Sequence, residues 1–214
     1  MGSNGLVLAS NSPRRQELLG RLGLSFTIRT AAVDEAERPD ESPQAMVTRL
    51  AQAKAEAVPL RPGEVLVAAD TTVALADTML GKPRSPDDAR RMLEALRDRV
   101  HAVHSGLTLR RADEIHTERI TTQVWMRPYT PAELEAYVTA GHPMDKAGAY
   151  GIQDEPFCPV ERLEGCYMNV VGLPLCHLAR ALLRWGVEVP ALPPGYCRTV
   201  LGGPCPVALF VEAP

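Results

Sequence analysis

The sequence predicts an α/β fold that contains a mixed β-sheet. Segments whose apolar residues follow helical spacing alternate with short apolar runs of strand length, which is the pattern of α/β proteins. Two longer segments, 102–110 and 116–127, flank a polar turn and add an antiparallel pair. The 214 residues, 45% hydrophobic and 23% charged, suffice for one domain or two small lobes around a buried core.

The first predicted strand leads directly into the first predicted helix. Residues 6–9 have the sequence LVLA, which is typical of a short buried strand. Ser12 is a suitable N-cap and Pro13 suits the first helical position, so we expect the helix to begin there. Gly23 marks its end.

The remaining elements follow from the same two patterns. Helical periodicity predicts helices at 44–57, 87–97, 131–140 and 173–185. The apolar run VLVAA predicts a buried strand at 65–69 that ends at Asp70, followed by a hairpin turn near Ala76 and Asp77.

Charge and hydropathy restrict the partners of the protein. The formal net charge of −3 argues against a duplex nucleic-acid binder, whereas a small anionic ligand needs only a few local Arg and Lys. The apolar stretches are no longer than strands, so we expect no membrane span. The N-terminal Met-Gly-Ser-Asn-Gly lacks the basic and apolar regions of a signal peptide. We therefore expect a cytoplasmic protein.

Neither the cysteines nor the C-terminal prolines predict a further functional unit. The five cysteines include no C-x-x-C pair and have no histidines at zinc spacing, which favours scattered reduced thiols in a cytosolic protein. Whether Cys197 and Cys205 pair stays open. Residues 190–214 are too rich in proline to form a helix, so we expect a domain at 1–189 followed by an extended tail.

The segment from Ser10 to Arg15 is the first candidate for an anion site. A strand that runs straight into a helix leaves free backbone N–H groups at the helix N-terminus, which attract phosphate. Arg14 and Arg15 oppose the helix dipole in the first turn, which makes sense if their guanidinium groups grasp a phosphate there. Two solvated surface arginines are the alternative.

Four other side chains are candidates for chemistry elsewhere in the chain. Asp70 follows a buried strand, where open α/β sheets place ligands, and it could hold Mg²⁺ or accept a proton from water. Lys82, between a glycine and a proline, can meet a phosphate as a point charge. The alternatives are a turn-forming Asp and a solvated lysine. His101 and His104 are interpreted as surface imidazoles.

Three positions say little on their own. The small residues of 145–153 (DKAGAYGIQ) allow close backbone approach, and Gln153 can read a base edge with its amide, but alone they predict only a tight loop. Glu35 lies in an acidic surface stretch and Lys54 on the polar side of a predicted helix.

The order and spacing of the motifs together resemble the Maf family of nucleotide pyrophosphatases. The motifs are LVLASNSPRRQELL, VDE, AQAKA, AADTTV, GKP, DKAGAYGIQ and NVVGLPL, and the resemblance spans about residues 6–185. It implies the fold shared with inosine triphosphate pyrophosphatases, an elongated mixed sheet flanked by helices in two lobes with a central cleft. It also implies a divalent cation, Mg²⁺ or Mn²⁺, and a homodimer.

The resemblance assigns roles to the matching positions. Asp70 would accept the proton, or activate water together with the metal, and Glu35 would help to hold the metal. Lys54 and Lys82 would neutralise the triphosphate. The other residues placed near the triphosphate are Ser10, Arg14 and Arg15. Water would attack the α-phosphorus, and pyrophosphate would leave.

Three positions separate two branches of this family. The branch resembling dTTP and UTP pyrophosphatases has Arg, Thr and Gln, matched here by Arg14, Thr71 and Gln153. The branch acting on 7-methyl-GTP has a bulky aromatic, Gln and Glu, which suit a methylated, positively charged guanine. The resemblance therefore implies a nucleoside triphosphate substrate such as dTTP, UTP or a modified pyrimidine nucleotide, with a 7-methyl-GTP-type activity as the alternative.

The chain also departs from the family pattern. Asp154, Glu155 and Pro156 follow Gln153, where the family usually has glycine, so we expect 154–162 to loop differently. An added carboxylate pair near the cleft would bear on metal or base preference. A rival hypothesis is a nucleotide-binding regulator of cell division without turnover. The set of Asp70, Glu35, Lys54 and Lys82 favours turnover, because a pure binder needs no base beside the phosphates.

Overall fold

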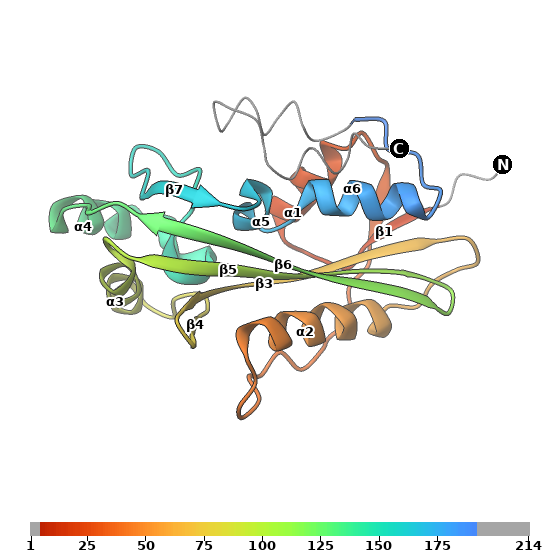
Figure 1. The fold of residues 1–214 in the computed structure, drawn as a ribbon, viewed down its shortest axis with the longest axis horizontal. Helices are drawn as coiled ribbons and strands as arrows, with labels where there is room; N and C mark the ends of the chain where they lie inside the picture. Colours follow the sequence, from red (N-terminus) through yellow and green to blue (C-terminus); the bar gives the residue numbers. More distant parts are fainter. Residues whose placement is uncertain (1–4, 192–214) are drawn as a thin grey trace.

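One seven-stranded mixed sheet runs through the computed structural model, which describes residues 5–191 (Figure 1). The strand order is β2-β1-β3-β5-β6-β7, with β4 paired to β3. β1 is parallel to β2 and β3, and the other pairs are antiparallel. The strands are β1 (Leu6–Leu8), β2 (Phe26–Ile28), β3 (Val65–Leu75), β4 (Thr78–Leu80), β5 (Val100–Arg111), β6 (Glu114–Met126) and β7 (Val160–Glu164). The predicted mixed α/β fold is confirmed.

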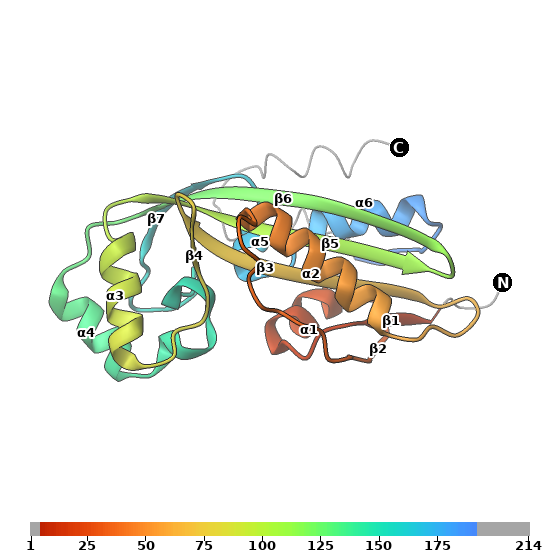
Figure 2. The ribbon, with the colours of Figure 1, turned by 90° about the horizontal axis from the view of Figure 1, so that it is seen from below.

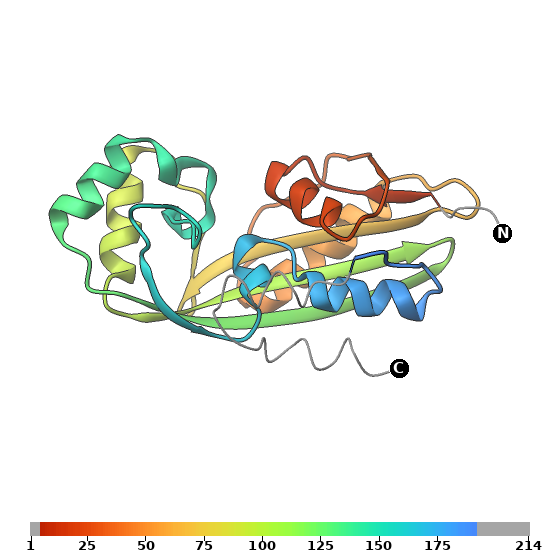
Figure 3. The same ribbon diagram turned by 90° about the horizontal axis from the view of Figure 1, so that it is seen from above.

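Helices cover both faces of the sheet and build a second lobe at one end (Figures 1 and 2). One face carries α2 (Pro43–Ala57), and the other carries α1 (Pro13–Gly20), α5 (Tyr167–Val171) and α6 (Leu175–Arg184). The small lobe contains α3 (Pro86–Leu96), α4 (Pro131–Thr139) and two 3-10 helices, η1 (His142–Asp145) and η2 (Ala147–Ala149). Seen from above in Figure 3, the small lobe stands apart from α1 while the long strands run beneath both.

The helix starts follow from their N-cap residues. Ser42, Ser85 and Thr130 each precede a proline, and each side chain accepts a hydrogen bond from a backbone N–H in the first turn. Proline at the first helical position removes an N–H that would have no partner there. The predicted helices at 44–57, 87–97 and 131–140 are therefore confirmed within one or two residues.

Each lobe has its own apolar core. In the large lobe, the buried leucines of α1 and α6 pack on the side chains of β1 and β3 that point toward these helices. A smaller cluster lies on the other face of the sheet, under α2. In the small lobe, α3 and α4 pack on the ends of β5 and β6. No helix among residues 5–191 is long and apolar enough to cross a membrane.

The structure differs from the prediction at several elements. The predicted helix 173–185 is confirmed as α6 within two residues, but the short helix α5 before it was not predicted. Gly172 has φ 123° and Pro174 follows it, so the chain turns between α5 and α6. Helix α1 ends at Gly20, before Gly23. The three-residue strand β2 and the strand β7 were not predicted. Both are edge strands with mostly exposed or half-buried side chains, which weakens any hydrophobic pattern.

The two histidines of β5 are buried, and their interpretation as surface imidazoles is wrong. Strand β5 is an inner strand of the sheet, so its side chains are covered on both faces. His101 Nε2 hydrogen-bonds the Tyr150 hydroxyl at 2.7 Å, and His104 Nδ1 hydrogen-bonds Thr121 Oγ1 at 2.9 Å. Burial lowers both pKa values, that of His101 to about 4, so both rings are neutral at physiological pH.

A charged cluster fastens α6 to β6. Both carboxylate oxygens of Glu118 accept hydrogen bonds from Arg180 Nη2 at 3.1 Å, and Glu118 Oε2 lies 3.1 Å from His177 Nδ1. The hydrogen bond from His177 and the charge of Arg180 lower the pKa of Glu118 to about 2, against a smaller opposing effect of burial.

Candidate active site

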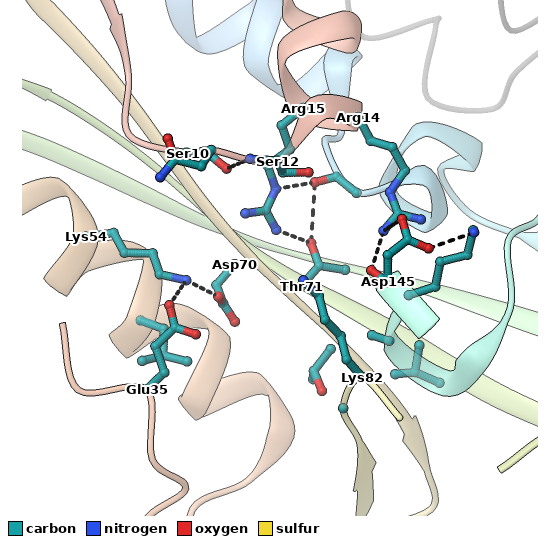
Figure 4. Close-up of a pocket in the computed structure, with 18 of the residues that line it drawn as sticks. Ser10, Ser12, Arg14, Arg15, Glu35, Lys54, Asp70, Thr71, Lys82 and Asp145 are labelled. Carbon is teal, nitrogen blue, oxygen red and sulfur yellow. Dashed lines mark hydrogen bonds and ion pairs between the residues drawn. The ribbon is translucent and has the colours of Figure 1, made fainter. Parts of the chain in front are cut away.

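A cleft of about 980 Å³ lies between the two lobes (Figure 4). Strand β1 pairs only with residues 65–67 of β3, and β4 pairs only with residues 73–75 on the same side. Residues 68–72 of β3 therefore form an open stretch of strand edge, and this edge is the floor of the cleft. Side chains from both faces of β3 can reach a ligand there.

Asp70 lies on this edge, inside β3 and not at its end. The prediction that the strand stops at Asp70 is wrong, because Thr71, Thr72 and Val73 are β-branched and continue the ladder with β5. The strand that ends beside Asp70 is its neighbour β1. Because β1 ends beside it, Asp70 lines the cleft, while its own backbone stays hydrogen-bonded in the sheet.

Glu35, Lys54 and Asp70 converge on one point of the cleft. Lys54 Nζ donates to Asp70 Oδ1 at 2.6 Å and contacts Glu35 Oε1 at 2.7 Å (Figure 4). Lys54 comes from the last turn of α2, where a cation is favoured by the helix dipole. Two carboxylates therefore share one ammonium group at the mouth of the cleft.

A glycine on β5 allows α2 to pack closely on the sheet near this cluster. Gly106 is paired with Asp70 in the sheet, and a Cβ at Gly106 would lie 2.1 Å from the carbonyl oxygen of Val47 on α2. Only glycine allows the helix to rest so closely on the strand. Lys54 lies about two turns further along α2, on the face that meets β3, so this close approach brings its ammonium group within reach of Asp70.

The two arginines at the start of α1 have different surroundings. Arg15 is half-buried, and its guanidinium donates to Ala69 O at 2.7 Å, to Gly172 O at 2.9 Å and to Thr71 Oγ1 at 3.2 Å. Burial lowers its pKa, and the charge of Asp70 opposes that effect. Arg14 reaches across the cleft instead, and its Nη2 donates to Asp145 O at 2.9 Å. Arg15 therefore braces β3, while Arg14 faces the cleft.

Ser10 and Lys82 also line the cleft, from opposite lobes. Ser10 is buried, and its Oγ accepts from the backbone N–H of Ser12, next to the N-terminus of α1. Lys82 is exposed and has no ion pair within residues 5–191. An exposed ammonium group without a carboxylate partner is available to a phosphate.

Comparison with known proteins identifies the family of this chain. The family model described as "Maf-like protein" matches residues 5–185. The chain belongs to the Maf-like protein family. A protein of Anaeromyxobacter dehalogenans named "dTTP/UTP pyrophosphatase" is 48% identical over 189 residues, which cover 86% of this chain and 96% of that protein. A protein of the same name from Moorella thermoacetica is 48% identical over 188 residues, with the same coverage.

One further relative and one solved structure complete the comparison. A "dTTP/UTP pyrophosphatase" of Myxococcus xanthus is 45% identical over 186 residues, covering 86% of this chain and 94% of that protein. A HAM1 protein from Coxiella burnetii has a TM-score of 0.41 and 17% identity, and the match covers 59% of this chain and 74% of that chain. That similarity is too low to support an argument about the site.

Of the three positions that separate the branches of the family, the structure brings two to the cleft. Arg14 and Thr71 line it, although the Thr71 hydroxyl also contacts Ser105 Oγ at 2.7 Å and Arg15. Gln153 is exposed and does not line the cleft. It lies in a turn closed by a hydrogen bond from Asp154 N to Gly151 O.

The donor set at the cleft fits a hard divalent cation. Residues 5–191 contain no group of three or more His, Cys, Asp and Glu side chains at metal-binding distance. Glu35 and Asp70 nevertheless present carboxylate oxygens to a single cationic atom, Lys54 Nζ. Two carboxylates completed by phosphate oxygens and water are the usual environment of Mg²⁺ at nucleotide sites.

Two residues at the cleft wall have roles that the sequence did not indicate. Asp145 and Lys146 belong to the predicted tight loop, yet both line the cleft and both are ion-paired there. Asp154, the first residue of the segment 154–162, also contacts this wall. The Asp154 carboxylate accepts from the Tyr137 hydroxyl and lies 3.3 Å from Lys146 Nζ, so it belongs to the support of this wall.

Proposed function

We propose that this protein hydrolyses dTTP and UTP, and modified pyrimidine nucleotides of the same kind, to the nucleoside monophosphate and pyrophosphate. The observation that carries the proposal is the convergence of Glu35 and Asp70 on Lys54 at the open edge of β3. The proposal is supported by relatives at 41–48% identity that are named dTTP/UTP pyrophosphatase.

The residues of the cleft divide the chemistry among them. Asp70, held by Lys54, is placed to accept a proton from the water that attacks the α-phosphorus. Lys54 and Lys82 neutralise the charge that develops on the phosphate oxygens. A divalent cation held by Glu35 and Asp70, when bound, would supply further charge neutralisation and orient the triphosphate. Positioning and charge neutralisation are the main contributions to phosphoryl chemistry.

The residue types at the cleft support a pyrimidine substrate. Arg14 stands where the 7-methyl-GTP branch has a bulky aromatic residue, and it lies in the cleft beside Asp145. Its guanidinium can donate hydrogen bonds to the carbonyl oxygens of a pyrimidine, but it offers no aromatic face to a methylated, positively charged guanine. We therefore expect 7-methyl-GTP to be a poor substrate.

Pyrophosphate release from a nucleotide panel tests the proposal. The panel contains dTTP, UTP, CTP, GTP, 7-methyl-GTP and 5-substituted pyrimidine nucleotides, each with Mg²⁺ or Mn²⁺. We expect dTTP and UTP to be hydrolysed best and Asp70→Asn to abolish release. A preference for 7-methyl-GTP would contradict the base assignment but not the reaction. Binding without release from any nucleotide would support the non-catalytic regulator of cell division instead.

Three further expectations accompany the proposed function. The divalent cation is tested by chelation, which should stop hydrolysis until Mg²⁺ or Mn²⁺ is restored. The homodimer is tested by sedimentation of the full chain, and the cytoplasmic location by fractionation of cells.

The proline-rich tail at 190–214 lies almost entirely outside the described residues, and Cys197 and Cys205 lie wholly outside them.

A further inference from the structure

At the small-lobe wall of the cleft lies a row of charges that the reaction at Asp70 does not use, made by Asp145 and Lys146 of that lobe and by Arg14, which reaches them from α1. Arg14 Nη2 lies 3.6 Å from Asp145 Oδ2, and Lys146 Nζ donates to Asp145 Oδ1 at 2.8 Å. The Asp145 carboxylate therefore lies between two cationic donors. All three residues line the cleft.

This carboxylate is ionised and open to a ligand. The Asp145 side chain is 67% exposed, so its oxygens retain room for another donor. Partial burial raises its pKa, but the hydrogen bond from Lys146 and the charges of Arg14 and Lys146 lower it further, and the net shift is downward. Within residues 5–191, Arg14 Nε and Nη1 donate no hydrogen bond and remain available.

The loop that carries Asp145 is firmly seated. Lys146 also donates to His142 O at 2.5 Å and is paired with Asp154 behind it. Gly148 N donates to Gly81 O at 3.0 Å, and a Cβ at Gly148 would lie 2.9 Å from the side chain of Val73. The loop thus rests directly on β3, and the spacing of the three charged groups is held by the fold.

The wall lies across the cleft from the Glu35–Lys54–Asp70 cluster, as Figure 4 shows for Arg14 and Asp145. A nucleotide whose α-phosphate lies at Asp70 therefore has the small-lobe wall available for its base.

Arg14 and Asp145 present a hydrogen-bond donor beside an acceptor on this wall, whereas the three N–H donors of Lys146 are taken by Asp145, His142 O and Asp154. The edge of uracil or thymine has the complementary order, with the O2 and O4 acceptors on either side of the N3–H donor. We propose that Asp145 is a specificity-determining residue whose carboxylate accepts the N3–H of the base, while Arg14 donates to a flanking carbonyl oxygen and Lys146 holds the carboxylate in place. This inference rests on the proposed function, because it assumes a nucleotide in the cleft.

The arrangement discriminates by chemistry at one edge of the base. Cytosine presents a lone pair at N3, which would face the carboxylate without a proton between them. A methyl group on N3 of uracil would remove the donor and collide with the acceptor. A substituent at C5 does not lie on this edge, so 5-substituted pyrimidines remain substrates.

The test compares kcat/KM for UTP, 5-methyl-UTP, 3-methyl-UTP and CTP in the wild-type protein and in Asp145→Asn. A site that hydrogen-bonds a substrate N–H rejects analogues that lack it, so we expect 3-methyl-UTP to fall at least about tenfold below UTP. The amide that Asp145→Asn introduces can accept from N3–H or donate to cytosine N3, so the ratio of UTP to CTP should fall by a similar factor of about ten. Asp77→Asn, on the exposed turn before β4, is the matched control and should leave the ratio unchanged.

The ratio separates base reading from a general change in charge or fold. A less acidic cleft would alter affinity for every triphosphate alike. Equal losses on UTP and CTP in Asp145→Asn, or wild-type hydrolysis of 3-methyl-UTP as fast as UTP, would overturn the inference. Dissociation constants of the same nucleotides, measured by calorimetry, give a readout without turnover. Binding that shows the expected ratio without pyrophosphate release would contradict the proposed function alone.

Discussion

Arg15 Nη1 donates to the carbonyl oxygen of Ala69 at 2.7 Å, so a half-buried guanidinium holds β3 one residue before Asp70. The same group also binds Thr71 Oγ1, one residue after it. The position of Asp70, the proposed general base, therefore depends on an arginine that binds the residues on either side of it.

Replacing Arg15 with lysine should impair turnover more than substrate binding. An ammonium group cannot reproduce three diverging N–H donors, so Ala69 O and Gly172 O lose their partners. We expect kcat to fall at least about tenfold with a smaller change in KM, and unfolding free energy to fall by about 1–3 kcal/mol. Steady-state kinetics well below the melting temperature and urea unfolding measure the two effects. Arg91→Lys, on the exposed side of α3, is the control, and a rise in KM alone would contradict a positioning role.

Glu35 and Lys82 should respond differently to metal concentration. Glu35→Gln removes a proposed ligand, so the Mg²⁺ concentration for half-maximal activity should rise about tenfold or more. Lys82→Met removes a proposed phosphate contact, so KM for the nucleotide should rise while the Mg²⁺ requirement stays the same. Titration of Mg²⁺ at saturating nucleotide distinguishes them. Equal Mg²⁺ curves for wild type and Glu35→Gln would exclude Glu35 as a ligand.

Gly106→Ala should loosen α2 from the sheet. The new methyl group would meet the Val47 carbonyl at 2.1 Å, and neither backbone can yield without moving the helix. We expect a loss of about 2–4 kcal/mol in unfolding free energy and a loss of activity through displacement of Lys54. Gly20→Ala, at the end of α1, meets no atom within 4 Å and should be neutral or slightly stabilising. Urea unfolding of both variants shows whether the close approach matters.

The Glu118 cluster should make stability depend on pH in the acid range. The pKa of Glu118 is lowered to about 2 in the folded protein, so its contribution is fully present above the unfolded-state pKa of about 4.5 and is lost as pH falls toward 2. We expect Glu118→Gln to lower unfolding free energy by about 1–2 kcal/mol at pH 7. The difference between variant and wild type should shrink between pH 5 and the lowest pH at which the fold survives, on the order of pH 3. A difference that stays constant over this range would show that packing, and not charge, is lost.

The sequence predicts the fold where the signal is local. Ser42, Ser85 and Thr130 each start a helix through their own side chains, so these helices are confirmed within one or two residues. Helix α5 was missed because its five residues are too few to show helical periodicity, whereas α6 is confirmed within two residues of its prediction. The continuation of β3 past Asp70 was missed because a charged residue resembles a strand end when its partner on α2 is unknown.

The site was predictable as a set of residue types but not as a geometry. Glu35, Lys54 and Asp70 come from three separate segments, and only folding shows that their charged groups meet at one atom. Arg14 and Arg15 are adjacent in sequence and equal in chemistry. The helix turns them apart by about 100°, so one is enclosed by backbone carbonyls and the other faces the cleft.

Strands β3, β5 and β6 continue without interruption from the large lobe into the small one. The lobes are therefore joined by a continuous hydrogen-bonded β-sheet and not by a hinge loop. Opening the cleft requires bending this sheet, which costs more free energy than rotating the backbone dihedrals of a hinge loop. The walls of the cleft are accordingly kept at a nearly constant width. The continuous strands thus fix the distance between the cleft walls, and this distance limits the size of the base that the cleft can accept.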